Sequence, residues 1–453
     1  MNRRNAALPF ILFILVGLAA PGLSGGIEAA AVKALVGGRL IDGFGGPPIA
    51  DSVVLIEGDR ITRVGQVGAV EIPPSAEVIS TEGMSVMPGL WDMHVHLMIN
   101  GHADYEHWDK TYPPLFESVI MPASARQLLM AGVTSARDLG APLDAILATR
   151  RAIERGSIPG PTLYVSGPFI QHAPYPGTEL FRWGVSGADD ARGKVEKLAE
   201  AGVDLIKLID QDQMTMDEVR AVVETAHEKG LTVVAHAHRP EEILRGLEAG
   251  VDCFEHTGLA TAPEYPPDVM DAIRSRTARM NLGPLFWTPT IEGLFNYERV
   301  RDNPEQLDDP SWHEGLPDEI VADIRISLEH YDRLPYFQIT PSRRPTLARK
   351  FEQLRSAGVV PLIGTDSGIP GKFHSQSTWN ELEVWINRLG VDPMEAIRSA
   401  TYWPAVAMKV SHEVGTVSEG KYADIIAVHG DVLRHVALLQ DVDLVIKHGV
   451  RYK

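Results

Sequence analysis

Cysteine is nearly absent from this 453-residue sequence, in which Cys253 stands alone. A single cysteine permits no internal disulfide, so stability must come from a packed core even in an oxidising compartment. With 44% hydrophobic residues the chain can supply such a core. Cys253 lies in the apolar run Gly-Val-Asp-Cys-Phe, where we expect it to be a small buried residue.

Positive charge is also scarce, because 42 lysines and arginines face 60 acidic residues and leave a net charge of −18. Such a protein repels nucleic acid and anionic membrane surfaces, so neither is expected as a partner. The sequence also lacks a P-loop, a Gly-x-Gly-x-x-Gly after a strand and a His-Glu-x-x-His. A Gly-x-Ser-x-Gly match at 22–26 has no strand before it and does not predict a serine hydrolase.

The amino terminus lacks an apolar run long enough to span a membrane, since the run at 6–20 falls short of the roughly 20 residues needed. Arg3 and Arg4 precede this run, and Pro, Gly and Ser follow it. This three-part layout predicts a signal peptide over residues 1–24, with an uncleaved membrane anchor as the alternative. We therefore expect a secreted or periplasmic protein with no stable membrane anchor after cleavage.

Short β-rich runs separated by turns occupy both ends of the remaining chain. The run Val53-Val54-Leu55-Ile56 and the Gly-Asp turn at 58–59 predict hairpins near the amino terminus. Those runs are too small for an independent core, and strand patterns at 421–428 and 444–450 offer a partner. We predict one small split β-sandwich domain, built from residues 32–85 together with 413–453.

Between the two ends, strand patterns alternate with amphipathic helical stretches such as 216–229. Eight such alternations over residues 86–412 predict an α/β fold of the (β/α)8 TIM-barrel type, with the active site at the carboxyl ends of the strands. An open doubly wound sheet is the alternative. The predicted strands are 90–97, 133–139, 162–167, 205–209, 232–237, 253–256, 286–290 and 360–365.

Two connections in this region are unusually long. One follows residue 97 and runs past His107 and Trp108, and the other is an insertion at 292–343 with a helical piece at 318–330. Long connections in compact domains are often lids or binding loops. We expect both to roof the active-site pocket.

The run from Pro88 to His96 ends in two histidines, His94 and His96, one residue apart. Side chains i and i+2 leave a strand on the same face, so this pair can point at one metal ion. Imidazole and carboxylate suit zinc and related ions, and a two-metal site needs about six ligands to hold its ions ~3.5 to 4 Å apart. Further metal-compatible residues end four other predicted strands: Lys207, His236, His256 and Asp366.

With these residues in place, the chain resembles the binuclear branch of the amidohydrolase superfamily, and within it the prolidase-like and metal-dependent carboxypeptidase-like members. The resemblance spans the mature chain, including the end domain. The motifs that carry it are Pro88-Gly-Leu-Trp-Asp-Met-His-Val-His96, Asp204-Leu-Ile-Lys207, Ala235-His-Ala-His238, Phe254-Glu-His256, Gly364-Thr-Asp-Ser-Gly368 and the closing Gly415-Thr-Val-Ser-Glu-Gly-Lys-Tyr-Ala-Asp424.

The resemblance implies two divalent metal ions, zinc foremost, and N6-carboxylation of Lys207, which would bridge them. A lysine desolvated inside a barrel can lose its proton and react with carbon dioxide. It also implies cleavage of an amide bond by a metal-bridging hydroxide, with Asp366 as the catalytic group that moves the proton. The implied ligands are His94, His96 and Asp366 for one ion and His236 and His256 for the other.

Residues that contact the substrate are harder to assign. His238 leaves the same face as His236 and is expected to line the pocket, with loop packing as the alternative. Arg137 ends the second strand, where a structural ion pair is favoured over a substrate role. The runs 169–175 and 209–213 lack the Gly-rich continuation of many prolidase-like members, which leaves the residues that clamp a substrate carboxylate unassigned. Three further candidates, with ordinary loop surface as the alternative, are His172, Tyr175 and Tyr297.

The small-molecule substrate favoured by these observations is a dipeptide or an N-acyl amino acid. A lactone, an ester or a cyclic amide cleaved on the same site is the enzymatic alternative. A catalytically inactive periplasmic binding protein is the alternative from another class, and the intact ligand set, with Asp366 present, argues against it. The oligomeric state stays open, a homo-oligomer included.

Overall fold

The computed structural model describes residues 32–258, 261–330 and 333–453. The predicted signal peptide therefore lies outside the described residues. In the part of the chain that is described, no helix combines the length and the apolar character needed to cross a membrane.

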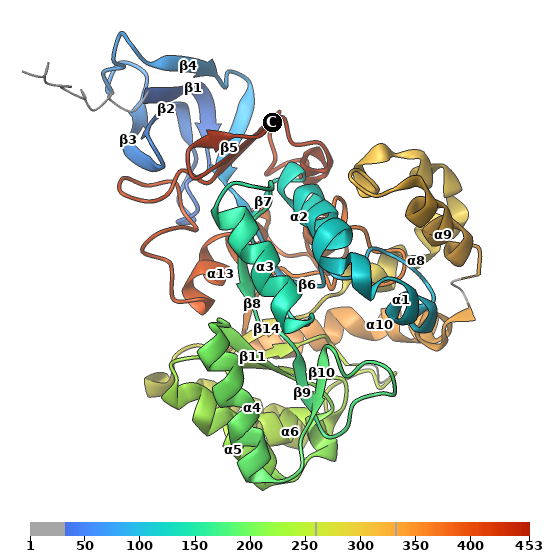
Figure 1. Ribbon diagram of the computed structural model, residues 1–453. Helices are drawn as coiled ribbons and strands as arrows, with labels where there is room; N and C mark the ends of the chain where they lie inside the picture. The colour runs from blue at the N-terminus through green and yellow to red at the C-terminus, as the bar shows by residue number, and fades with distance from the viewer. Residues whose placement is uncertain (1–31, 259–260, 331–332) are drawn as a thin grey trace, which may run out of the picture.

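Strands from both ends of the chain form one eight-stranded sheet, in the order β18-β17-β16-β5-β1-β2-β3 with β4 beside β1. The join is antiparallel pairing of β5 with β16, in register from Met84 opposite His429 to Pro88 opposite Ile425. Figure 1 shows the blue and red ends of the chain side by side in this sheet. The strands are β1 Val32–Leu40, β2 Ile49–Glu57, β3 Arg60–Gln66, β4 Glu77–Ser80, β5 Met84–Pro88, β16 Ile425–His429, β17 Leu444–Lys447 and β18 Val450–Arg451.

Parallel strands form the middle of the molecule, in a seven-stranded sheet, β10-β9-β11-β12-β13-β14-β15, and a three-stranded sheet, β6-β7-β8. Every predicted strand position carries one of these strands, whereas β9 and β10 were not predicted. The strands are β6 Leu90–Val95, β7 Val133–Asp138, β8 Thr162–Val165, β9 Phe169–Gln171, β10 Arg182–Gly184, β11 Leu205–Leu208, β12 Thr232–His236, β13 Cys253–Glu255, β14 Phe286–Thr288 and β15 Val360–Pro361.

Backbone hydrogen bonds join β6 to the segment that follows β15. The Met93 N–H donates to the Ile363 carbonyl at 3.0 Å, and the Asp366 N–H donates to the His94 carbonyl at 2.6 Å. Gly364 allows this close approach, because a Cβ there would lie 2.8 Å from the His94 nitrogen. The eighth predicted strand therefore delivers Asp366 beside His94.

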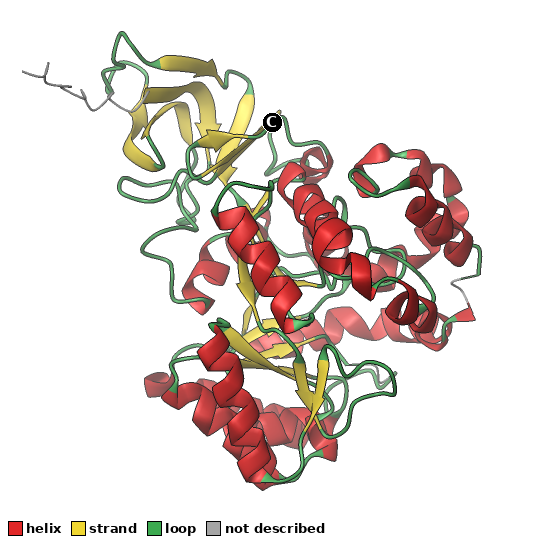
Figure 2. Ribbon diagram, in the orientation of Figure 1, coloured by secondary structure: helices red, strands yellow, loops and turns green. Residues whose placement is uncertain are grey.

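Helices pack around the parallel strands (Figure 2). In α5 a capping box between Thr215 and Glu218 fixes the start, and the face that carries Val219 and Val222 is buried. The packed helices are α2 Met121–Met130, α3 Leu143–Glu154, α4 Ala188–Ala201, α5 Met216–Glu228, α6 Pro240–Ala249, α7 Pro267–Thr277, α10 Pro335–Ser356, α11 Ser377–Leu389, α12 Pro393–Ser399 and α13 Tyr402–Ala407.

The two long connections contain helices of their own. The first forms α1, Tyr105–Thr111, and the second forms α8, Glu292–Asp302, and α9, Asp318–Leu328, close to the predicted helical piece. Figure 1 places α1, α8 and α9 together at one end of the parallel strands. We call this group of helices the roof.

Candidate metal centre and active-site cavity

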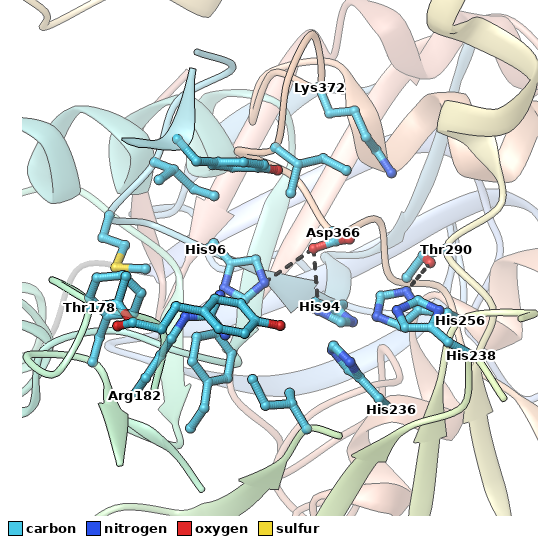
Figure 3. Close-up of a pocket in the computed structure, with 18 of the residues that line it drawn as sticks. His94, His96, Thr178, Arg182, His236, His238, His256, Thr290, Asp366 and Lys372 are labelled. Carbon is cyan, nitrogen blue, oxygen red and sulfur yellow. Dashed lines mark hydrogen bonds and ion pairs between the residues drawn. The ribbon is translucent and has the colours of Figure 1, made fainter. Parts of the chain in front are cut away.

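A cavity of about 440 Å³ opens at the carboxyl ends of the parallel strands. Side chains from strand ends line its floor, and Tyr105 and Asp109 from α1, Leu294 from α8 and Arg343 from α10 line its rim. Figure 3 shows the labelled imidazoles of His94, His96, His236, His238 and His256 gathered beside Asp366. The predicted ligands at this end that line the cavity are His94, His96, His236, His256 and Asp366.

The first cluster consists of His94, His96 and Asp366. Asp366 Oδ1 lies 3.4 Å from His94 Nε2 and 3.2 Å from His96 Nε2. Burial raises the pKa of Asp366, but the two neighbouring imidazoles outweigh it and hold that pKa well below its usual range. Two imidazole nitrogens and an ionised carboxylate within 4.8 Å of one another are a donor set that suits zinc.

The second cluster consists of His236, His238 and His256, whose ligand atoms also lie within 4.8 Å of one another. The rings of His238 and His256 stack, with centroids 4.4 Å apart. His238 lines the cavity, as predicted, and stands close enough to the predicted ligands to be a donor itself. Burial lowers the pKa of His238 to about 3, so it is a neutral imidazole with a lone pair available.

Two of these residues have left-handed backbone conformations. His256 has φ of +74° and Asp366 has φ of +63°, values that non-glycine residues seldom adopt. Backbone strain of this kind costs roughly 1–3 kcal/mol per residue and gathers at functional sites. The conformation turns both side chains toward the cavity instead of continuing the strand.

Glu255 ends β13, next to His256 in the chain, and is fully buried. Its carboxylate contacts His94 Nδ1 at 2.9 Å and Arg137 Nη2 at 2.5 Å. A His94 Nδ1–H donated to Glu255 leaves the Nε2 lone pair facing the cavity. The motif Phe254-Glu-His256 was recognised in the sequence, yet nothing in its pattern showed the partner of its glutamate.

A substrate-binding role for Arg137, the less favoured expectation, is wrong. Its side chain is buried beneath the cavity, where it donates to the Met93 carbonyl at 2.7 Å and pairs with Glu255. The structural ion pair favoured at this position exists, and its acidic partner comes from β13. A guanidinium held in this way has no access to a substrate.

Lys207 is fully buried at the end of β11. Among the described residues its Nζ has no hydrogen-bond partner, which is costly for an amine in a protein interior. Burial lowers the pKa of Lys207 to about 8, and Glu255 and Asp366 oppose the shift. A buried, unsatisfied and readily deprotonated amine beside both histidine clusters fits a lysine that carries a carbamate.

Of the remaining substrate candidates, Tyr175 lines the cavity and its hydroxyl donates to Asp210 at 3.2 Å. His172 is exposed and lines a separate groove, so its assignment to the pocket is wrong. The side chain of Tyr297 lies outside the described residues.

Sequence reasoning missed Arg182 and Lys372, which both line the cavity. Arg182 lies over the ring of Tyr175, 4.5 Å from its centroid, and donates to Gln171 at 3.2 Å. Lys372 lies 3.3 Å from Glu292 and donates to the Thr365 carbonyl. The only sequence signal for Arg182 was its position between Phe181 and Trp183. Lys372 gave no such signal.

The fold and the donor set define a class, and comparison with known proteins agrees. The family model described as "Amidohydrolase family" matches residues 85–451, so this chain belongs to the amidohydrolase family. Ochratoxinase from Aspergillus niger is 24% identical over 461 aligned residues, covering 91% of this chain and 84% of that one. Imidazolonepropionase from Streptomyces coelicolor is 23% identical, covering 89% and 92%.

Among solved structures, a prolidase complexed with N-methylphosphonate-L-proline superposes with a TM-score of 0.71 at 25% identity, covering 93% of this chain and 100% of that one. These matches confirm the predicted superfamily and the likeness to its prolidase-like members. The protein is therefore a hydrolase that acts on carbon–nitrogen bonds.

Proposed function

We propose that this protein is a binuclear metal-dependent amidohydrolase that cleaves the amide bond of a dipeptide or an N-acyl amino acid. The observation that carries the proposal is the pair of donor clusters on one cavity floor, with the unsatisfied Nζ of Lys207 buried beside them. Among the described residues the Nδ1 atoms of His96 and His238 are buried without a hydrogen-bond partner, whereas a purely structural role would require one.

The donor set fits two divalent ions, zinc foremost. His94, His96 and Asp366 would hold one ion and His236 and His256 the other, with Lys207 as the bridging ligand. For Lys207 the neutral Nζ forms a bond to the carbon of carbon dioxide and releases a proton, which leaves an anionic carbamate. Bound ions would polarise the scissile carbonyl and lower the pKa of a water molecule.

Within the protein, Asp366 is the group that moves the proton. It is ionised, so it can accept a proton from the attacking water and pass it to the leaving nitrogen. His94 and His96 flank the same carboxylate oxygen and keep it directed at the cavity. Glu255 holds His94 in turn, so the geometry is set before substrate arrives.

The other end of the cavity supports the proposed substrate class. Figure 3 places Arg182 and Thr178 opposite His238 and His256. Among the described residues the Nε of Arg182 has no hydrogen-bond partner, and its guanidinium lies over the rings of Phe169 and Tyr175, with Asp109 acting on it electrostatically. A guanidinium in that setting suits a carboxylate, which dipeptides and N-acyl amino acids both carry.

A turnover screen of metal-loaded protein tests the proposal. It compares dipeptides and N-acyl amino acids with their carboxyl-terminal amides, and it includes lactones, esters and cyclic amides. We expect hydrolysis of the free-acid substrates and much weaker hydrolysis of the amidated ones. Turnover of the lactones, esters or cyclic amides alone would replace the proposed substrate class, and metal binding without turnover would favour a binding protein.

The bridging role of Lys207 has its own experiment. Lys207→Ala should lose metal and activity together, and short carboxylic acids should restore part of both by supplying a bridging carboxylate. Lys229, an exposed lysine that follows α5, provides the matched basic control as Lys229→Ala. A Lys207→Ala protein that retains two ions and wild-type turnover would contradict the role.

We further propose that the two parallel sheets belong to one (β/α)8 barrel over residues 86–412, and that the chain ends build a split β-sandwich domain. The backbone bonds between β6 and residues 363–367 support the first point, and the pairing of β5 with β16 supports the second. Deleting residues 421–453 would expose the edge of β5 and should cause aggregation. A soluble, fully active truncation would contradict the shared sheet.

Export by a signal peptide over residues 1–24 is proposed on the sequence pattern alone. Intact-mass analysis of protein expressed with the full chain should show the loss of about that segment. A mature protein that begins at Met1 would contradict it.

A further inference from the structure

Three potential metal ligands meet in the roof, outside the cavity clusters. His102 precedes α1, His107 lies in α1 and Asp323 lies in α9. Asp323 Oδ2 is 3.4 Å from His102 Nε2 and 2.9 Å from His107 Nε2, and the two imidazole rings stack at 5.4 Å. These separations match those between neighbouring ligands around one small ion, for which Zn–N and Zn–O distances are ~2.0 to 2.2 Å.

The environment of His102 is a second indication that this site binds a ligand. Its side chain is only 3% exposed, and among the described residues Nε2 has no hydrogen-bond partner. Its other nitrogen, Nδ1, lies 3.0 Å from both the carbonyl oxygen and the N–H of Asp104. In the tautomer that donates Nδ1–H to the Asp104 carbonyl, the Nε2 lone pair faces Asp323, an arrangement common in metal-binding histidines.

The surroundings of Asp323 also suit a metal. The Tyr112 hydroxyl donates to Asp323 Oδ2 at 2.7 Å and orients the carboxylate. The His107 and Asp323 side chains are 43% and 29% exposed, so an ion and a water ligand can reach the site from solvent. The buried ring of Trp108 packs against His102, with centroids 5.3 Å apart, and limits its movement.

We propose that His102, His107 and Asp323 bind one divalent transition-metal ion of the zinc type, with water as the fourth ligand. Two imidazoles and one carboxylate are a donor set that zinc accepts. The ion would clamp α1 to α9 across the two long connections. Because α1 also carries Tyr105 and Asp109, which line the cavity, the clamp would hold one wall of the substrate pocket.

Metal analysis of the full chain tests this site independently of the reaction. The experiment compares wild type with His107→Gln and Asp323→Asn. Each protein is equilibrated with zinc and desalted, and its zinc content is measured by elemental mass spectrometry. Each variant should contain about one ion per chain less than wild type. His412→Gln, a change at a 74% exposed histidine in a salt-bridging pair, is the matched control and should lose none. Equal zinc in all four proteins would overturn the proposal.

A second measurement decides the case even where a variant fails to fold. Crystals of wild type grown with zinc should give an anomalous difference peak within ~2.0 to 2.2 Å of the three ligand atoms. Peaks at the cavity clusters with none in the roof would overturn the roof site and leave the proposed function standing. A roof peak without cavity peaks would support the roof site and overturn the proposed function.

Discussion

The floor and the roof of the cavity hold their side chains in different ways. On the floor, His94 is 1% exposed and is fixed by the ladder of β6 and by Glu255. In the roof, α1 is seven residues long and Tyr105 is 37% exposed. Rigid strand ends suit a reaction that needs exact ligand geometry, whereas short helices in long connections can vary with the substrate.

The largest effect should come from the floor, at Asp366. Asp366→Asn retains the shape and one acceptor oxygen but cannot take a proton. Because general acid–base transfer contributes ~10² to 10⁴ in rate, kcat should fall by about that factor with a smaller change in KM. Steady-state kinetics and metal analysis of the same preparation measure both. A variant within a few-fold of wild type, or one fully restored by excess metal, would leave Asp366 as a ligand only.

The second-largest effect should come from Glu255, because it supports a floor residue, His94, without itself touching the cavity. Glu255→Gln weakens the support of His94 and leaves the buried Arg137 without its anionic partner. Loss of such an outer contact typically costs ~10- to 100-fold in metal affinity, and we expect that rise in Kd in a chelator competition. Glu224→Gln, on the exposed face of α5, is the matched control. Unchanged metal affinity would show that the strand ends alone orient His94.

Arg182 separates substrate selection from the reaction. Arg182→Met should lower kcat/KM roughly tenfold for free-acid substrates, the equivalent of about 1.5 kcal/mol for a charge-assisted hydrogen bond. The change should fall mainly on KM, because the two histidine clusters are untouched. Arg274→Met, at a 60% exposed arginine of α7, serves as control. An equal loss for amidated substrates would show that Arg182 does not read the carboxylate.

The smallest effect belongs to a pair away from both regions. His227 Nε2 contacts Asp252 at 2.9 Å, and this hydrogen bond raises the pKa of His227. A raised histidine pKa adds stability that is complete below about pH 6.5 and is lost as the pH rises through the folded value. Both groups are partly exposed, so His227→Gln should cost less than about 1 kcal/mol at pH 6 and nothing at pH 9. Denaturant melts at both pH values measure it, and activity should not change.

Much of the floor could be predicted from the sequence because its signals are local. His94 and His96 follow an apolar run with the two-residue period of a strand, and Lys207 and Asp366 end similar runs. The strands β9 and β10, each three residues long, were missed because so short a run has no measurable period. His172 was misassigned because it lies in the connection between β9 and β10, which turns its side chain outward.

The sequence by itself determined which residues end the parallel strands, since alternation and apolar runs are properties of neighbouring residues. Only the tertiary structure decided that Arg137 pairs with Glu255, 118 positions away, and that Arg182 faces the histidine clusters across the cavity. It alone brought His102 and His107 to Asp323, from a helix more than 200 positions further along the chain. Such partners are set by how helices and long connections pack, and no local period records that packing.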